Sequence, residues 1–219
     1  MEIPFDPLDP FPLRELTPEL YPAAKRHAAA VDAWLGLRVK ETEAAIHDPQ
    51  DGQQRWIGTH PSVFLTPYVE LREWCEALRP GAGQTICDLG AGYGRLGFVL
   101  AHHFPQARFL GLELVPERVK EGSLALERFS ARNASLMQAD LQTATPPAAD
   151  LYFVYDYGTR EAIEKTLGDL REISVRQKIR VVARGRAVRD AVERRHPWLG
   201  SVHVPLHRAH YSVYRSFPE

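Results

Sequence analysis

The chain has 219 residues, which suits one domain with an extension, and its 44% hydrophobic and 25% charged residues are ordinary for a globular protein. No run approaches the roughly 20 apolar residues that cross a bilayer, and the first ten residues lack both the basic start and the apolar run of a secretion signal. Two cysteines do not make a disulfide framework, so we expect a cytoplasmic protein that does not use a membrane.

The formal net charge of -1 hides an asymmetry along the chain. From Arg171 onward there are 11 Lys and Arg against 4 Asp and Glu. This excess predicts either an anionic partner at the C-terminal part or arginines that merely solvate the outer faces of a strand and a helix. Both interpretations stay open.

The N-terminal third predicts an extended arm and then helices. Six prolines between residues 4 and 22 favour extended or turn-like backbone. From Ala23 to Ile46, apolar residues recur at helical spacing, which predicts one long amphipathic helix. A further helix should begin near Thr66-Pro67, with Thr66 as its cap. We divide the chain into residues 1–65, an extension that is a candidate lid, and residues 66–219, a Rossmann-like domain.

Strand and helix patterns alternate through the rest of the chain, which predicts an α/β fold with a doubly wound, mostly parallel, seven-stranded sheet. The last two strands are close enough to form an antiparallel edge hairpin. The predicted strands are Gln84–Leu89, Arg108–Leu114, Ser135–Gln138, Leu151–Tyr155, Ile179–Arg184, Ser201–Pro205 and Tyr211–Ser216.

The clearest local signal is the stretch from Thr85 to Gly97, TICDLGAGYGRLG. A short apolar run ends in a carboxylate, a turn dense in glycine follows, and an apolar helix begins. A strand, a tight loop and a helix N-terminus in this order let a ligand approach bare backbone at the edge of a sheet.

Acidic residues lie at the ends of several predicted strands. Asp88, Glu113, Asp140 and Asp156 lie at or just after the ends of four successive predicted strands. The carboxyl ends of parallel strands meet at one edge of a sheet, where ligands bind. We therefore expect the first three to contact a ligand together with the glycine loop.

The segment from Asp88 to Gly94, DLGAGYG, with Glu113 and Ala139-Asp140-Leu141, resembles the class I S-adenosylmethionine-dependent methyltransferases over roughly residues 66 to 219. The resemblance implies that the glycines face the methionine part of the cofactor, that Asp88 balances its ammonium group, that Glu113 accepts from the ribose hydroxyls and that Asp140 accepts from the adenine amino group. The cofactor residues that it implies are Asp88, Gly90, Ala91, Gly92, Gly94, Arg95, Glu113, Leu114, Asp140 and Leu141.

The same loop also fits a dinucleotide fingerprint, through Gly92-x-Gly94-x-x-Gly97 with Glu113 19 residues beyond Gly94. Charge argues against that alternative, because Asp88 would repel a pyrophosphate and attract a cationic ligand. An NAD(P)-binding oxidoreductase and a non-catalytic S-adenosylmethionine-binding protein remain the alternatives to an S-adenosylmethionine-dependent methyltransferase that releases S-adenosylhomocysteine.

Candidates for the acceptor side follow the fourth strand. Asp156 is a candidate to orient or deprotonate an acceptor, and Tyr155 and Tyr157 to wall the methyl site. The alternative is that Asp156 serves only the turn. No triad or metal is expected, and His203, His207 and His210 lack the partners of a zinc site.

The segment Thr66-Pro67-Tyr68 resembles an element of some lysine methyltransferases without a SET domain, which implies that Thr66 and Tyr68 help close the cofactor pocket. The Asn/Asp-Pro-Pro-Tyr/Phe motif of amino-directed nucleic-acid methyltransferases is absent after the fourth strand. A protein lysine or a small molecule is therefore favoured as acceptor over a nucleic-acid base, and Arg95 either meets the cofactor carboxylate or decorates a helix.

Overall fold

A computed structural model describes residues 2–46 and 56–218 of the chain. Its centre is a seven-stranded sheet in the order β3-β2-β1-β4-β5-β7-β6. The first five strands are parallel, while β7 pairs antiparallel with both β5 and β6. The predicted doubly wound sheet with an antiparallel edge hairpin is confirmed. The strands are β1 Thr85–Leu89, β2 Arg108–Glu113, β3 Ala134–Gln138, β4 Leu151–Tyr155, β5 Arg180–Arg184, β6 Leu206–His207 and β7 Tyr211–Arg215.

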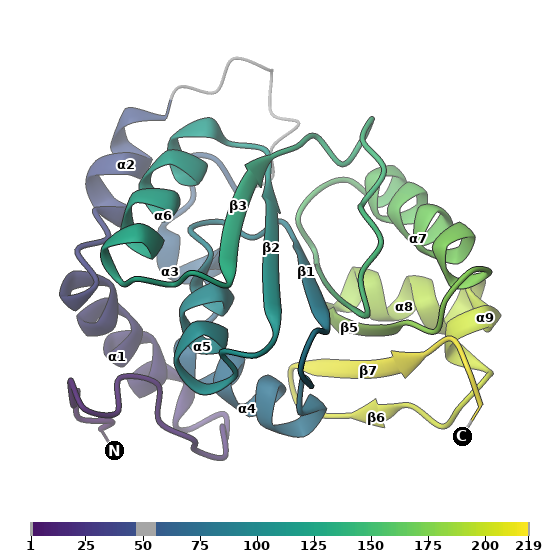
Figure 1. Ribbon diagram of the computed structural model, residues 1–219, viewed down its shortest axis with the longest axis horizontal. Coiled ribbons are helices and arrows are strands. Elements are labelled where there is room, and N and C mark those ends of the chain that lie inside the picture. The colour runs from purple at the N-terminus through teal and green to yellow at the C-terminus, as the bar shows by residue number, and fades with distance from the viewer. Residues whose placement is uncertain (1, 47–55, 219) are drawn as a thin grey trace.

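Helices cover both faces of the sheet, as Figure 1 shows, with α1, α2, α5 and α6 gathered on one side and α7, α8 and α9 on the other. The helices are α1 Tyr21–Trp34, α2 Val39–Ala45, α3 Pro61–Phe64, α4 Tyr68–Leu78, α5 Arg95–His103, α6 Pro116–Arg128, α7 Arg160–Ser174, α8 Arg186–Arg195 and α9 Pro197–Gly200. Three of them, α3, α8 and α9, were not predicted.

Alternating side chains of the buried strands supply two hydrophobic clusters. In β4, Leu151 and Phe153 belong to the cluster shared with α4 and α5, whereas Tyr152 and Val154 belong to the cluster shared with α7 and α8. Successive residues of a strand point to opposite faces, so a strand covered on both sides is apolar throughout.

The N-terminal extension shares the first of these clusters. Phe11, Val31 and Leu35 are buried in it beside residues of α4, α5 and β2. The ring of Phe11 is fully buried, 5.1 Å from that of Tyr68. Residues of the extension therefore pack as part of the same core.

The prediction of one helix from Ala23 to Ile46 is wrong, because the chain turns between α1 and α2. Gly36 has a φ of +69°, which favours glycine and ends the helical path. Ala28, Val31, Leu35 and Val39 are nevertheless all buried, so the pattern of burial continues across the break. The predicted break at His47–Gln54 lies wholly outside the described residues.

Two local predictions are also corrected. The residues from Ser201 to Pro205 are not a strand, and the edge strand β6 begins at Leu206 instead. Proline has no N–H to give to a ladder, so Pro205 suits the approach to an edge strand better than its interior. Helix α4 is capped by Pro67 and receives no side-chain cap, so the predicted capping role of Thr66 is wrong.

Candidate functional site

A pocket opens where the carboxyl ends of the parallel strands meet the glycine loop. Ten of the residues predicted for the cofactor line it, as do Tyr155 and Tyr157. Gly94, Tyr68 and Asp156 do not line it. The predicted residues in its wall are Thr66, Asp88, Gly90, Ala91, Gly92, Arg95, Glu113, Leu114, Asp140 and Leu141.

The glycine loop is shaped by close approach as well as by backbone angles. Gly90 has a φ of +87°, and a Cβ at this position would lie 2.6 Å from Cβ of Tyr157. The N–H groups of Gly90 and Ala91 both donate to the Leu112 carbonyl at 2.9 Å. Gly94, with a φ of +74°, starts α5. A side chain on Gly90 would therefore both strain the turn and displace Tyr157.

Glu113 ends β2 and joins the loop to the sheet. Its Oε2 accepts from the Gly92 N–H at 2.8 Å and its Oε1 accepts from the Val115 N–H at 3.0 Å. The residue is 6% exposed and lines the pocket. Each carboxylate oxygen has a second lone pair, so both can still accept from a ligand hydroxyl.

Asp88 lies in β1 at the floor of the pocket. Within the described ranges no group donates a hydrogen bond to its carboxylate. Enclosure by the protein, and to a smaller degree the nearby Glu113 carboxylate, raise the pKa of Asp88 from 3.8 to about 7. A carboxylate in this position is stabilised by a cation and destabilised by a phosphate.

Asp140 follows β3 on the far side of the glycine loop. Its Oδ1 accepts from the Gln142 N–H at 2.9 Å, which fixes the turn after the strand. Leu141 is buried beside it, and Leu114 lines the same part of the pocket. Two apolar side chains flanking a carboxylate suit a flat polar ring such as a purine.

Arg95, the first residue of α5, is held by the N-terminal extension. Its Nε donates to Oδ1 of Asp32 at 3.1 Å, its Nη2 pairs with Oδ2, and its Nη1 donates to the Thr66 carbonyl at 3.0 Å. Tyr68 donates to the same aspartate at 2.8 Å. Arg95 thus both lines the pocket and forms a buried ion pair with α1, while Tyr68 lies behind the wall.

A second buried ion pair ties α2 to the site. Arg118 of α6 donates through Nε and Nη2 to the two oxygens of Glu43, at 2.8 and 2.9 Å. Tyr93 of the glycine loop donates to Glu43 at 2.7 Å. Arg118 lines the pocket, and its guanidinium lies 4.6 Å from the centre of the Phe64 ring. Two helices of the extension therefore position residues of the pocket.

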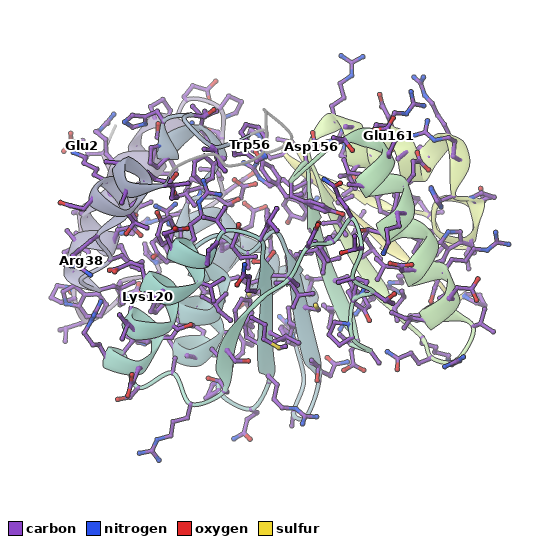
Figure 2. The ribbon with its side chains drawn as sticks, turned by 90° about the horizontal axis from the view of Figure 1, so that it is seen from above. Glu2, Arg38, Trp56, Lys120, Asp156 and Glu161 are labelled. Atoms are coloured by element: carbon purple, nitrogen blue, oxygen red, sulfur yellow. The ribbon has the colours of Figure 1, made fainter. Side chains whose placement is uncertain are left out.

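Aromatic rings close the other end of the pocket. The Trp56 ring stacks on that of Tyr155 at 6.0 Å, and its Nε1 donates to the Asp156 carbonyl at 2.7 Å. Figure 2 shows Trp56 and Asp156 next to each other. The Arg184 guanidinium lies 4.8 Å from the centre of the Tyr155 ring. Trp56, which belongs to the N-terminal extension that we gave as a candidate lid, is part of the wall.

The carboxylate of Asp156 is engaged by α8. Its oxygens accept from the Val188 N–H at 3.0 Å and from the Ala187 N–H at 3.3 Å. A Cβ on Gly185 would lie 2.5 Å from the Asp156 carboxyl carbon, so the glycine makes room for this contact. The geometry favours the interpretation that Asp156 has a structural task over the prediction that it acts on an acceptor.

Tyr157 is likewise engaged. Its hydroxyl lies 2.5 Å from that of Thr166 and donates to the Ala162 carbonyl at 3.2 Å. Burial raises the pKa of Tyr157 to about 12. This hydroxyl stays protonated near neutral pH. The first carbon atoms of the Tyr157 side chain pack against Gly90 of the glycine loop.

Comparison with solved structures identifies the fold. No protein-family model matches the chain, and no curated protein matches it either. An RNA methyltransferase from Salinibacter ruber in complex with S-adenosyl-L-homocysteine is 24% identical, with a TM-score of 0.51, over 71% of this chain and 94% of that one. A precorrin-6y C5,15-methyltransferase from Geobacter metallireducens is 16% identical, with a TM-score of 0.52, over 71% and 90%. The chain has the Rossmann-like fold of the class I methyltransferases.

TrmN from Thermus thermophilus shares this methyltransferase fold at 16% identity and a TM-score of 0.51, where the match covers 69% of this chain and 48% of TrmN. The described part of the chain has no helix long and apolar enough to cross a membrane. It also has no group of three or more His, Cys, Asp or Glu that could hold a metal ion.

Several residues of the pocket wall, and the acidic partners of two arginines in that wall, were missed, although weak signals existed. Asp32 and Glu70 are acidic residues at buried positions of amphipathic helices, where a charge implies a partner. Arg184 ends the fifth strand, so its position at a strand end could have identified it, but we considered only acidic residues at such positions. Other missed residues of the wall include Trp56, Phe64, Leu71, Trp74, Arg118, Phe153 and Val182.

Proposed function

We propose that the protein is an S-adenosylmethionine-dependent methyltransferase. The observation that carries this proposal is the pairing of a glycine loop with Asp88, a carboxylate that receives no hydrogen bond from the described residues and whose pKa is raised to about 7. The pyrophosphate of a dinucleotide would meet this carboxylate where it needs donors. An ammonium and a sulfonium would instead be stabilised there.

The remaining residues fit the other parts of such a cofactor. We assign Glu113 to the ribose hydroxyls, Asp140 to the adenine amino group, and Gly90 and Gly92 to the methionine backbone. Arg95 is the cation on the loop side of the pocket, so it is our candidate for the cofactor carboxylate. The ligand complex of the Salinibacter ruber structure supports this choice of cofactor.

Bound S-adenosylmethionine supplies a methyl group already activated by its sulfonium. The chain then has to align an acceptor and exclude water. Trp56 and Tyr155 cover the pocket at the acceptor end, and the ion pairs of Arg95 and Arg118 hold the walls in place. These are positioning tasks.

Titration calorimetry with S-adenosylmethionine, S-adenosylhomocysteine and NAD tests the proposal. We expect both adenosyl ligands to bind and NAD not to bind. Binding of NAD alone would support the oxidoreductase alternative. Binding of both adenosyl ligands without methyl transfer to any acceptor would support the non-catalytic alternative.

A further inference from the structure

Glu43 of the N-terminal extension is the centre of a hydrogen-bond cluster behind the pocket wall. Its Oε1 accepts from the Tyr93 hydroxyl at 2.7 Å and from Arg118 Nε at 2.8 Å, and its Oε2 accepts from Arg118 Nη2 at 2.9 Å. The side chain of Glu43 is 10% exposed and that of Arg118 is 4% exposed. Figure 1 shows α2, which carries Glu43, beside α6, which carries Arg118. Glu43 itself does not line the pocket.

Arg118 also faces Glu113, the carboxylate that we assign to the ribose hydroxyls. Its Nη1 lies 3.8 Å from Glu113 Oε1, which is beyond hydrogen-bond distance. Both residues line the pocket. Arg118 therefore lies between two carboxylates, and its hydrogen bonds go to the one behind the pocket wall rather than to the one in the wall.

The separation of Arg118 from Glu113 decides whether Glu113 can bind a ligand with both oxygens. Glu113 Oε1 already accepts from the Val115 N–H at 3.0 Å, which leaves one lone pair on that oxygen. A guanidinium at hydrogen-bond distance would occupy this lone pair. A shift of about 1 Å would bring Arg118 that close, and a buried arginine that had lost its partner would be drawn to the nearest carboxylate. The two hydrogen bonds to Glu43 oppose this shift.

We propose that Glu43 is a positioning residue for the cofactor, which holds Arg118 away from Glu113 so that the Glu113 carboxylate stays free to accept from the ribose hydroxyls. This deepens the proposed function and rests on it. Glu43 acts through Arg118 and does not touch the ligand. The N-terminal extension thereby contributes to recognition of the ribose from behind the pocket wall.

Titration calorimetry with S-adenosylhomocysteine and with its 2′,3′-dideoxy analogue, which lacks both ribose hydroxyls, tests the proposal. The wild-type protein should bind S-adenosylhomocysteine at least about tenfold more tightly than the analogue. In Glu43→Gln, the affinity for S-adenosylhomocysteine should fall about fivefold or more while the affinity for the analogue stays within about twofold, so the preference for the hydroxyls shrinks. A residue that only stabilised the fold would change both affinities alike.

Three further variants separate this role from a general effect of charge or folding. Glu41→Gln removes an exposed acid from the first turn of the same helix and should leave both affinities within about twofold. Adding Arg118→Met to Glu43→Gln removes the competing cation, so the preference for the hydroxyls should return to within about twofold of that of the wild-type protein. Tyr93→Phe removes one hydrogen bond to Glu43 and should shrink the preference about twofold or more, so it carries the test if Glu43→Gln does not fold.

Equal losses of affinity for the two ligands in Glu43→Gln would overturn the proposal, as would a preference that Arg118→Met does not restore. Equal effects of Glu41→Gln and Glu43→Gln, or an unchanged preference in Tyr93→Phe, would overturn it as well. Equal binding of the two ligands by the wild-type protein would also overturn it and leave the proposed function standing. Failure of S-adenosylhomocysteine to bind the wild-type protein would instead contradict the proposed function.

Discussion

Asp88 is the residue that decides between S-adenosylmethionine and a dinucleotide, the two classes of ligand that the glycine loop would accept. It lies in β1 among the buried apolar residues Ile86, Cys87 and Leu89, and no hydrogen bond from the described residues reaches its carboxylate. An unpaired carboxyl that the protein partly shields from water prefers its neutral form, which the raised pKa expresses. A cation bound nearby would restore the ionised form.

The affinity for S-adenosylmethionine should therefore rise as pH increases through about 7, the raised pKa of Asp88, because the cofactor binds best to the ionised carboxyl. In the ligand-free protein the effect of pH has the opposite sign, because there it acts on stability. There the contribution of Asp88 to stability is present below its ordinary pKa of 3.8 and is lost as pH rises to about 7. Calorimetry between about pH 6 and pH 7.5 measures the change in affinity, and thermal unfolding measures the change in stability. Asp88→Asn should abolish both, and a pH dependence that persists in this variant would contradict the assignment.

Glu113→Ala should weaken cofactor binding by about 1–3 kcal/mol, because it removes the acceptor of the ribose hydroxyls and the partner of the Gly92 N–H. Titration calorimetry measures the change. Glu117→Ala, an exposed acid in the first turn of α6, is the control and should have no effect. If both variants bind equally well, the ribose is held elsewhere.

At the scale of elements, α8 shows how a loop residue acquires a task that its own neighbours do not reveal. Asp156 follows β4, but its carboxylate caps a helix that begins after β5. The N-terminal N–H groups of a helix need acceptors, and the preceding Gly185 has no side chain to supply one. β4 and β5 are neighbours in the sheet, so the hydrogen-bond acceptor for α8 comes from the end of β4.

Asp156→Ala should lower the free energy of unfolding by about 0.5–2 kcal/mol, as loss of a helix cap does, and should leave cofactor affinity unchanged. Chemical denaturation and calorimetry measure the two quantities. The control is Asp190→Ala, which changes a partly exposed side chain of α8, the helix that Asp156 caps. A rate of methyl transfer that falls while stability is unchanged would restore the catalytic interpretation of Asp156.

At the scale of the whole molecule, the extension and the sheet domain depend on each other. The buried pairs Asp32–Arg95 and Glu43–Arg118 cross between them, and Arg95 and Arg118 line the pocket. Charges buried this deeply are tolerated only when paired. We therefore expect the extension to act as a permanent wall of the site, in addition to its predicted role as a lid.

Arg95→Met should destabilise the protein by about 3–5 kcal/mol, because it leaves the Asp32 carboxylate buried without its counter-charge. Adding Asp32→Asn should recover part of that loss, as denaturant unfolding would show. Arg186→Met, which breaks the exposed pair with Asp190, should change stability by less than about 0.5 kcal/mol. Equal costs for the two arginine variants would mean that the buried pair does not join the extension to the domain.

The sequence by itself determined the alternation of strands and helices in the sheet domain, the glycine loop, and the acidic residues at the strand ends. These features are local, since a loop such as Asp88 to Gly94 joins a strand to the helix that follows it directly. The patterns also placed Glu113 and Asp140, because the ends of parallel strands always meet at one edge of the sheet.

Only the tertiary structure decided which partners these residues have. Asp32 and Arg95 are 63 residues apart, Glu43 and Arg118 are 75 apart, and Glu70 and Arg184 are 114 apart. No periodicity links residues at such distances, because their contact depends on how α1, α2 and α4 pack on the sheet. The end of the pocket near Trp56 and Tyr155 is assembled from contacts of this kind, so its chemistry became visible only in the folded chain.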